Sequence, residues 1–283
     1  MDINQYIKYL TQEAEHAMIA EVEAGPKPGL VDRYNNGSHQ DMDINTFRIS
    51  AQTLAPEFEH FMELSNSYGS DMVLPILREP GMEAEAKMYQ VTHGFNTHKG
   101  LIFSLGLIVA CLVRLAKKLD HKPGWGDRKA LVELIRLNTK GLTDELETAT
   151  EETNGLLVFQ TYGLKGVRQE AEEGFPAIFN YGLPKLKEYK ALYKDDDLPL
   201  LMTLLELILV TGDTNLVKRG GLEGLNFMQS RSLSILIASA KLTEPELLER
   251  FKTFDEDAIS KNLSPGGAAD NLAICIFLDQ VLS

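Results

Sequence analysis

Residues 98–119, HKGLIFSLGLIVACLVRLAKKL, decide the fold of this chain. Over most of this stretch a helix would carry apolar side chains on every side, which is typical of a helix surrounded by protein. Its most apolar part, residues 100–113, is bracketed by Lys99 and Arg114 and is too short to span a bilayer comfortably. The stretch therefore predicts a buried central helix on which other helices pack.

The flanking sequence has helical periodicity nearly everywhere. Apolar residues recur at steps of three and four in 3–24 and again in 44–62, as on the buried face of amphipathic helices. No run alternates convincingly as a strand, and the best candidate, GLLVFQTYG at 155–163, reads equally well as the end of a helix. The sequence thus predicts an all-α fold, a single compact multi-helix domain that spans residues 1–283. Further helices are expected at about 80–92, 127–138, 143–152, 166–180, 184–194, 197–210, 222–241, 243–260 and 267–282.

The composition limits the classes of partner. The chain has 283 residues, with 28 lysines and arginines against 41 aspartates and glutamates, and its net charge is −13. Such an acidic chain is a poor candidate for non-specific binding to nucleic acid or to an anionic membrane, so a polyanion would need a local basic pocket or a metal ion. Both cysteines, Cys111 and Cys275, lie in apolar runs, and the N-terminus MDINQYIKYL lacks the basic start and apolar core of a signal peptide. We therefore expect a cytoplasmic protein with two buried cysteines.

Five polar stretches interrupt the helical pattern. Each carries charged residues beside glycine or proline and stands near an expected helix end, where backbone groups lack partners within the helix and are available to a ligand. The five are residues 25–43, which begin GPKPGLVDRYNNG; 93–100, HGFNTHKG; 166–176, GVRQEAEEGFP; 212–221, GDTNLVKRGG; and 262–270, NLSPGGAAD.

Together these stretches contain the parts of a nucleotide site. The SPGG sequence before the last helix, with Ser264, Gly266 and Gly267, could offer a phosphate free N–H groups and the positive end of a helix dipole. Cations suited to further phosphate charge are Lys27, Arg33, Lys99, Arg168, Lys218 and Arg219. Oxygen ligands of the type that Mg²⁺ prefers are Asp32, Asp41, Asp43, Glu170, Glu172, Asp213 and Asp270.

Each stretch taken alone has an ordinary structural explanation. Ser264 fits a helix cap, and the sequence DTN at 213–215 fits an Asx turn. Glu170 with its acidic neighbours is typical of a solvated helix face, and His98 is typical of a hydrogen-bonded core histidine. A site is indicated because all five stretches occur together.

In their order and spacing, the five stretches resemble the motifs of the triphosphoribosyl-dephospho-CoA synthase family. The matching segments are PKPGLVDRYNNGSHQDMD, NTHKG, EAEEGFP, DTNLVKRGG and LSPGGAAD, and the resemblance runs from about residue 20 to the C-terminus. Two positions depart from the pattern of the family. Gln169 stands where glycine is expected, and Ala268 replaces a serine, which leaves no hydroxyl at that position.

The resemblance implies a reaction between ATP and 3′-dephospho-CoA. The 2′-hydroxyl of the dephospho-CoA ribose attacks C1 of the ATP ribose, adenine leaves, and the triphosphate stays on the product. The family makes in this way the precursor of the prosthetic group of citrate lyase, and a related branch serves malonate decarboxylase. A separate transferase loads the product on an acyl-carrier subunit, so we expect a stand-alone synthase that uses Mg²⁺.

Residue type suggests how the motifs would share this chemistry. Displacing adenine builds positive charge at C1 and on the ring oxygen, so the site needs carboxylates near the sugar, a proton donor for the base and a base for the hydroxyl. We expect Glu170 to be the base, Asn96 and His98 to contact the sugar or the adenine, and Asp32 to assist. Mg²⁺ is expected at Asp32, Asp213 and Asp270, directly or through water. The triphosphate is expected at Lys27, Arg33, Lys99 and Arg219 and at the Ser264–Gly267 helix start, with Arg168 and Lys218 as further nucleotide-binding cations.

Two other classes of protein stay open at this stage. An all-α, Mg²⁺-dependent hydrolase of an N-ribosyl bond would use the same carboxylates with water as the acceptor. A helical nucleotide-binding regulator would bind without turnover. Adenine release that depends on dephospho-CoA distinguishes the synthase from both. The client, citrate lyase or malonate decarboxylase, and the oligomeric state also stay open.

Overall fold

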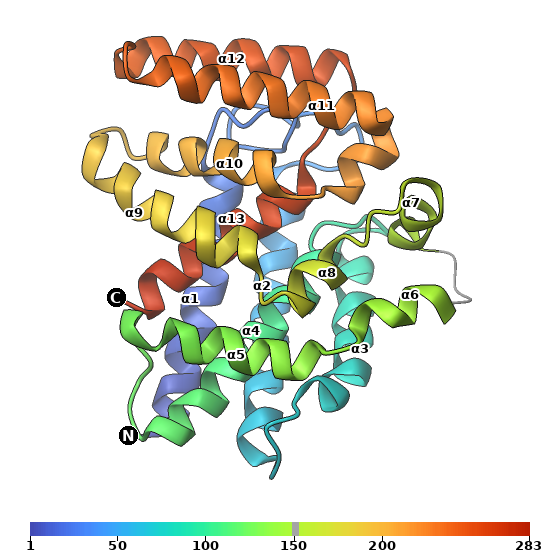
Figure 1. Ribbon diagram of the computed structural model, residues 1–283, viewed down its shortest axis with the longest axis vertical. Helices are drawn as coiled ribbons and strands as arrows, with labels where there is room; N and C mark the ends of the chain where they lie inside the picture. Colours follow the sequence, from blue (N-terminus) through green and yellow to red (C-terminus); the bar gives the residue numbers. More distant parts are fainter. Residues whose placement is uncertain (149–152) are drawn as a thin grey trace.

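Helix α4 (Lys99–Leu119) runs through the middle of the molecule (Figure 1). The computed structural model describes residues 1–148 and 153–283, and within these ranges the chain forms helices and no strand. Residues 104–116 of α4 are all buried. By length and composition α4 could cross a membrane, but 83% of its apolar window is buried inside the protein, as expected for a core helix. The predictions of an all-α fold and of a buried central helix are therefore confirmed.

The other helices of the described chain pack against α4 or against one another. They are α1 (Ile3–Glu23), α2 (Ile44–Ser67), α3 (Leu74–Val91), α5 (Arg128–Thr139), α6 (Glu145–Thr148), α7 (Asn154–Tyr162), α8 (Val167–Glu172), α9 (Leu183–Leu192), α10 (Leu198–Val210), α11 (Thr214–Ser239), α12 (Glu244–Ser260) and α13 (Gly266–Val281). Short 3₁₀ turns, η1 (Trp125–Asp127) and η2 (Leu142–Asp144), precede α5 and α6, and a π-helical turn, η3 (Ala177–Gly182), precedes α9.

One hydrophobic core joins these helices. Helix α1 packs on α2 and α13, α2 packs on α3 and α4, and α10 packs on α9, α11 and α13. The cluster of buried apolar residues runs from Tyr6 to Leu282, as the predicted single domain requires. Both cysteines, Cys111 and Cys275, are free and buried within it.

Several helix boundaries differ from the prediction. The expected start at Pro80 is wrong: α3 begins at Leu74, because Pro75 already supplies the proline favoured in a first helical turn, and Pro80 lies inside the helix. The ambiguous stretch 155–163 is helical, as α7, and ends at Gly163 with a φ of 73°. Of the helix expected at 143–152, residues 149–152 lie outside the described residues.

Two predicted helices are broken or extended at glycines. The helix expected at 166–180 ends at Glu172, since Gly174 and Phe175 have φ angles of 78° and 55°, and the chain resumes as η3. The helix expected at 222–241 begins earlier, at Thr214, and bends at Gly221, where φ is 62°. A positive φ interrupts the helical ladder in both places.

The first polar stretch forms a buried strap between α1 and α2. Residues 24–32 are all buried, although they include two prolines and the charged residues Lys27 and Asp32. Gly29 has a φ of 70°, and a Cβ there would lie 2.0 Å from the carbonyl oxygen of Leu263, so glycine is required. The Gly29 N–H donates to Asp255 Oδ1 of α12 at 2.8 Å. The strap therefore ties the end of α1 to α12 and to the segment that precedes α13.

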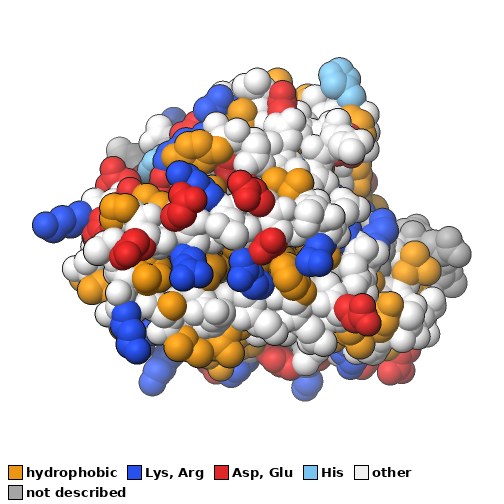
Figure 2. Space-filling view, turned by 90° about the horizontal axis from the view of Figure 1, so that it is seen from above, with side chains coloured by type: hydrophobic (Ala, Val, Ile, Leu, Met, Phe, Trp, Pro, Cys, Tyr) orange, Lys and Arg blue, Asp and Glu red, His pale blue; other side chains and the backbone are white. Residues whose placement is uncertain are grey.

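The helix ends collect at the upper end of the bundle in Figure 1. Helix α1 ends there, and α2, α4, α11 and α13 begin there. Figure 2 shows the molecule from above, where lysines and arginines are interspersed with aspartates, glutamates and apolar side chains. The described part of that face is therefore a surface of mixed charge.

Replacing Gly106 of α4 by alanine is expected to lower the free energy of unfolding by about 1–3 kcal/mol. A Cβ at Gly106 would lie 2.9 Å from two carbons of the Phe61 ring, which is 1% exposed. The matched control is Gly81→Ala inside α3, where no atom lies within 4 Å of the added Cβ. There we expect a gain of about 0.5–1 kcal/mol from helix propensity. Urea denaturation measures both changes, and equal shifts for the two variants would contradict the tight α2–α4 contact.

Candidate active site

The fold brings all five sequence motifs into one continuous set of contacts. Lys27 of the first motif lies close enough to His98 of the second to lower its pKa. The second motif touches the fifth, because a Cβ at Gly100 would lie 2.3 Å from Asp270 Oδ2. The remaining contacts join Asp213 to Gly267 (the fourth and fifth motifs) and Gly166 to Thr214 (the third and fourth). Motifs far apart in sequence therefore form one site at the end of the bundle.

Lys27 makes a buried ion pair that the sequence did not indicate. Its side chain is 1% exposed, and Nζ donates to Glu21 Oε1 at 2.5 Å and to the Glu21 carbonyl oxygen at 2.6 Å. Burial raises the pKa of Glu21, and the Lys27 charge opposes that rise. A signal for Glu21 exists in the sequence, because it stands four residues after Ala17, on the apolar face of α1. A charged residue at a core position is an informative exception to the helical pattern.

His98 is a neutral, buried imidazole. Its Nδ1 lies 2.8 Å from Ser50 Oγ, and its ring packs edge-on against Phe47 with centroids 5.3 Å apart. Burial and the Lys27 charge lower the pKa of His98 to about 3. Thr97 Oγ1 hydrogen-bonds to Ser50 Oγ, so the Ser50 hydroxyl links Thr97 to the imidazole. The other ring nitrogen, Nε2, makes no hydrogen bond with a described residue.

Asp270 is the least satisfied carboxylate of the site. It lies in the first turn of α13 against Gly100, and within residues 1–148 and 153–283 its oxygens accept no hydrogen bond. Burial, and then the charges of Glu21 and Asp213, raise the pKa of Asp270 well above its usual value. Such an unsatisfied carboxyl is typical of a functional site.

Both carboxylate oxygens of Asp213 accept hydrogen bonds from backbone N–H groups. Oδ1 accepts the N–H groups of Asn215 and Leu216 at the start of α11, at 2.8 and 3.1 Å. Oδ2 accepts those of Gly267 and Ala268 at the start of α13, at 2.8 and 3.2 Å. Burial raises the pKa of this carboxyl, and the four N–H groups oppose the rise. One side chain therefore caps two helices.

The SPGG sequence takes its shape from this cap. A Cβ at Gly267 would lie 3.2 Å from Asp213 Cγ, and one at Gly266 would lie 2.9 Å from Asn215 Nδ2. The two glycines thus allow α11 to approach α13. The N–H groups of Gly267 and Ala268, expected to face a phosphate, donate to Asp213.

Asp32 organises the strap. Its Oδ2 accepts the N–H of Lys27 at 2.7 Å, and its Oδ1 accepts those of Tyr34 and Asn35 at 2.7 and 3.1 Å. Gly25 packs against this carboxylate, since a Cβ at Gly25 would lie 2.8 Å from Asp32 Oδ2. The structure places Asp32 beside the site and gives its oxygens backbone partners.

Arg219, His39 and Ser264 form a polar network at the edge of the site. Arg219 Nη1 donates to the Ser38 carbonyl oxygen at 3.0 Å and to Asn262 Oδ1 at 2.8 Å, and Nη2 lies 3.2 Å from His39 Nδ1. His39 Nε2 lies 3.1 Å from Ser264 Oγ. Burial and the Arg219 charge lower the pKa of His39, so the imidazole is neutral and links the arginine to the serine.

The remaining expected cations differ in their surroundings. Arg33 pairs with Asp197, and Lys99 Nζ pairs with Glu85 Oε2 at 2.8 Å. Asn96 Oδ1 accepts the Lys99 N–H at 3.0 Å and so caps α4. Lys218 is exposed and Arg168 is half-buried, and neither makes an ion pair or a hydrogen bond with the described residues. These last two cations are free to meet an anionic ligand.

Glu170 lies in a cavity of about 460 Å³ between α8, η3 and the end of α10. Its Oε2 accepts the N–H of Ala177 at 3.2 Å. Burial raises the pKa of Glu170; the Ala177 hydrogen bond lowers it and the charge of Glu173 raises it. The structure thus places the expected base in a hollow beside the start of α11.

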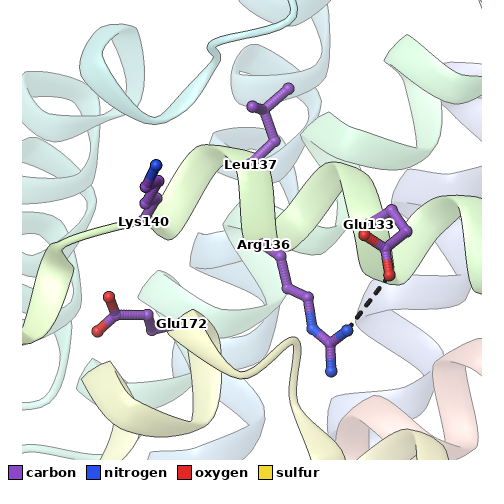
Figure 3. A pocket seen from close by; sticks show the side chains of 5 residues that line it. All are labelled: Glu133, Arg136, Leu137, Lys140 and Glu172. Atoms are coloured by element: carbon purple, nitrogen blue, oxygen red, sulfur yellow. Dashed lines mark hydrogen bonds and ion pairs between the residues drawn. The ribbon is translucent and has the colours of Figure 1, made fainter.

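A second hollow lies on the other side of α8 and has a different character. Figure 3 shows Lys140 and Glu172 at one end of it and, at the other, Arg136 paired with Glu133 at 3.2 Å. Glu172 accepts the N–H groups of Gly141 and Thr143 at 2.7 and 3.2 Å. Its carboxylate therefore holds the turn between α5 and α6 and is committed to structure.

The expected Mg²⁺ has no complete set of protein ligands among the described residues. Among the described residues, no group of three or more His, Cys, Asp or Glu side chains is placed to hold a metal. Asp32 and Asp213 bond to backbone N–H groups, which leaves Asp270 as the carboxylate with free oxygens. Mg²⁺ is commonly bound by one or two carboxylates together with substrate phosphates, and Asp270 suits that arrangement.

We expect Asp270→Asn to stabilise the protein at neutral pH in the presence of a chelator. A carboxyl whose folded-state pKa is raised favours folding below its unfolded pKa and loses that contribution as the pH rises through the folded pKa. Asparagine carries no charge to desolvate, so its advantage should shrink as the pH falls toward about 4. Thermal unfolding between acidic and neutral pH measures the difference. The exposed Asp196→Asn is the control, and a wild type as stable as D270N at neutral pH would contradict the account of Asp270.

Asp213→Ala should cost about 3 kcal/mol or more of unfolding free energy, because it uncaps two helices and leaves buried N–H groups without acceptors. Asp43→Ala provides the comparison. Asp43 caps only α2, accepting the Thr46 N–H at 2.9 Å, and its loss should cost about 1 kcal/mol. Urea denaturation of both variants tests the double cap, which would be wrong if the two losses were equal.

Comparison with known proteins identifies the relatives of this chain. The family model of CitG, the ATP:dephospho-CoA triphosphoribosyl transferase, matches residues 7–283. The chain is 41% identical over 273 residues to the probable 2-(5''-triphosphoribosyl)-3'-dephosphocoenzyme-A synthase of Citrobacter koseri, covering 95% of this chain and 89% of that protein. It is 39% identical over 281 residues to the 2-(5''-triphosphoribosyl)-3'-dephosphocoenzyme-A synthase of Escherichia fergusonii, covering 96% and 91%.

A further relative is longer. The chain is 40% identical over 283 residues to protein CitXG of Haemophilus influenzae. The matched region covers 97% of this chain but only 60% of CitXG. No solved structure matches the chain significantly. The family match extends over nearly the whole chain and contains all five motifs of the site. This chain therefore belongs to the ATP:dephospho-CoA triphosphoribosyl transferase family.

Proposed function

We propose that this protein transfers the 5-triphosphoribosyl group of ATP to the 2′-hydroxyl of 3′-dephospho-CoA and releases adenine. The product would be 2′-(5″-triphosphoribosyl)-3′-dephospho-CoA, the precursor of the citrate lyase prosthetic group. The observation that carries the proposal is the meeting of five motifs at one end of the bundle, which brings buried carboxylates and a neutral histidine into one set of contacts. The printed names of two relatives describe the same synthase.

The sugar would react between Asp270 and His98. Breaking the bond from C1 to N9 develops positive charge on C1 and on the ring oxygen, and a preorganised carboxylate stabilises that charge. Asp270 suits this role because its oxygens accept no hydrogen bond from the described residues and remain available to the sugar. His98 Nε2 would contact the sugar or the adenine, and the Asn96 amide would contact the same group.

Glu170 would carry the proton of the reaction. The acceptor O2′ forms a bond to C1, N9 leaves with the electron pair of the broken bond, and the hydroxyl proton ends on adenine. Burial raises the pKa of Glu170 and makes its carboxylate a better base near neutral pH. A single carboxyl can take the proton from the hydroxyl and deliver it to the departing base.

The triphosphate would bind mainly to the cations that have no partner among the described residues. We propose contacts with Arg168 and Lys218, which have no partners among the described residues. Lys27, Arg33 and Lys99 would share their charge with their present carboxylate partners, and Arg219 would approach from the network with Ser264. Mg²⁺ brought by ATP would neutralise phosphate charge, held by Asp270 directly and by Asp32 and Asp213 through water.

The place of the protein in the cell belongs to the same proposal. Citrate lyase is the proposed client, reached through a separate transferase and an acyl-carrier subunit, and the malonate decarboxylase branch is the alternative client. We place the synthase in the cytoplasm, where ATP and dephospho-CoA are found. The rival readings predict other products: an N-ribosyl hydrolase would release adenine without dephospho-CoA, and a regulator would release none.

Glu170→Gln is expected to lower the rate of adenine release by about a hundredfold or more. The variant keeps the size of the side chain but cannot accept the hydroxyl proton. Chromatography of adenine, with ATP and Mg²⁺ and with or without dephospho-CoA, measures the rate. Glu133→Gln, in the second hollow, is the control and should keep the wild-type rate. A Glu170→Gln protein that turns over normally would remove Glu170 from this role, and adenine release without dephospho-CoA would favour the hydrolase.

A further inference from the structure

The cavity that holds Glu170 has the size of a ligand pocket. Its volume is about 460 Å³, within the usual range for small-molecule sites. Its walls come from the turn before α8, from η3 and from the end of α10, and they include Leu164, Pro176, Ala177, Tyr181 and Val210. Apolar walls with a few polar groups are typical of pockets that bind a flat organic ring.

Tyr181 gives the cavity an aromatic surface. The side chain is 47% exposed although it belongs to η3, whose Ala177, Ile178 and Phe179 are buried. A π-helical turn is rare and occurs frequently at functional sites. An aromatic ring at the rim of an apolar cavity offers a face on which a heterocycle can stack.

The charged groups favour a hydrogen-bond donor over an anion. Glu170 and Glu173 line the cavity together with one cation, Lys165. Glu170 Oε2 accepts the Ala177 N–H, and Glu173 Oε1 accepts the Gln169 amide at 2.8 Å. The other carboxylate oxygen of Glu170 accepts no hydrogen bond from a described residue. It is therefore available to an N–H group of a bound ring.

The cavity adjoins the rest of the site. Gly212, one of its lining residues, directly precedes the Asp213 cap of α11. Gly166, another lining residue, lies against Thr214, since a Cβ there would be 2.9 Å from Thr214 Cγ2. A ligand with a ring in the cavity would therefore have its polar part directed to the start of α11, where the charged motifs begin.

We propose that this cavity binds the adenine ring of a substrate, with the ring stacked on Tyr181 and an adenine N–H donated to Glu170. The proposal deepens the proposed function, on which it rests for the presence of adenine. Both ATP and dephospho-CoA carry this ring, and free adenine is the released base. The ring and its N–H groups match the apolar walls and the free carboxylate oxygen.

Direct binding of free adenine tests the cavity without turnover. Equilibrium dialysis with radiolabelled adenine should show saturable binding to the wild type. Tyr181→Ala should weaken it on the order of tenfold through lost stacking. Gly212→Leu should abolish it by filling the cavity, because no atom lies within 4 Å of a Cβ at Gly212. Gly81→Leu in α3, which is equally uncrowded, is the control and should bind adenine as the wild type does.

Steady-state kinetics of the same variants identify the source of the ring. A KM for ATP that rises about tenfold, with an unchanged KM for dephospho-CoA, would assign the cavity to ATP, and the reverse would assign it to dephospho-CoA. Either result supports the proposal. Wild-type adenine binding in both Tyr181→Ala and Gly212→Leu would overturn it, even if the synthase reaction is present. Adenine binding that is lost in both variants would sustain the cavity site even if no transferase activity were found.

Discussion

The site depends on one buried carboxylate, that of Asp213. It holds the starts of α11 and α13 together through four backbone hydrogen bonds, across 54 positions of sequence between Asp213 and Gly267. With α13 fixed in this way, Asp270 comes to lie against Gly100 at the start of α4. The buried strap then fixes the other side, because Gly29 packs on the Leu263 carbonyl oxygen just before α13. The hydrogen-bonded carboxylate of Asp213 and the buried strap therefore fix the position of Asp270, whose own oxygens accept no hydrogen bond from the described residues.

The same arrangement concentrates negative charge where water is scarce. Glu21 and Asp213 lie close enough to Asp270 for their charges to raise its pKa, and Lys27 forms an ion pair with Glu21. Burying carboxylates that are not fully paired lowers stability, and such clusters are retained where a reaction uses them. Arg168 and Lys218 have no partners among the described residues, so these two cations are available to an anionic group of a ligand.

The sequence predicts the parts of this molecule that depend on local pattern. The burial of α4 follows from apolar side chains on every face, and the helices follow from their period of three to four residues. The start of α3 was predicted at the wrong residue because Pro75 and Pro80 can each mark the first turn of a helix. The break after Glu172 depends on Gly174 and Phe175 in left-handed conformation, which a helical pattern does not reveal.

The site was predictable as a set of motifs and less so as a set of roles. Residue type alone indicates that Asp32, Asp213 and Asp270 could each bind a metal. Whether the oxygens of a carboxylate are free depends on backbone N–H groups supplied by distant segments, as at Gly267 for Asp213. Glu21 was missed because it lies outside the five polar stretches, although its position on an apolar helix face marks it.

The most direct test of the account is the mass of the product formed from ATP, Mg²⁺ and 3′-dephospho-CoA. We predict an adduct with the mass of dephospho-CoA plus an intact triphosphoribosyl group, formed in equal amount with free adenine. An adduct that lacks phosphates would contradict a site that holds the triphosphate without cleaving it. Adenine without any adduct, or ATP left intact, would contradict the transfer itself.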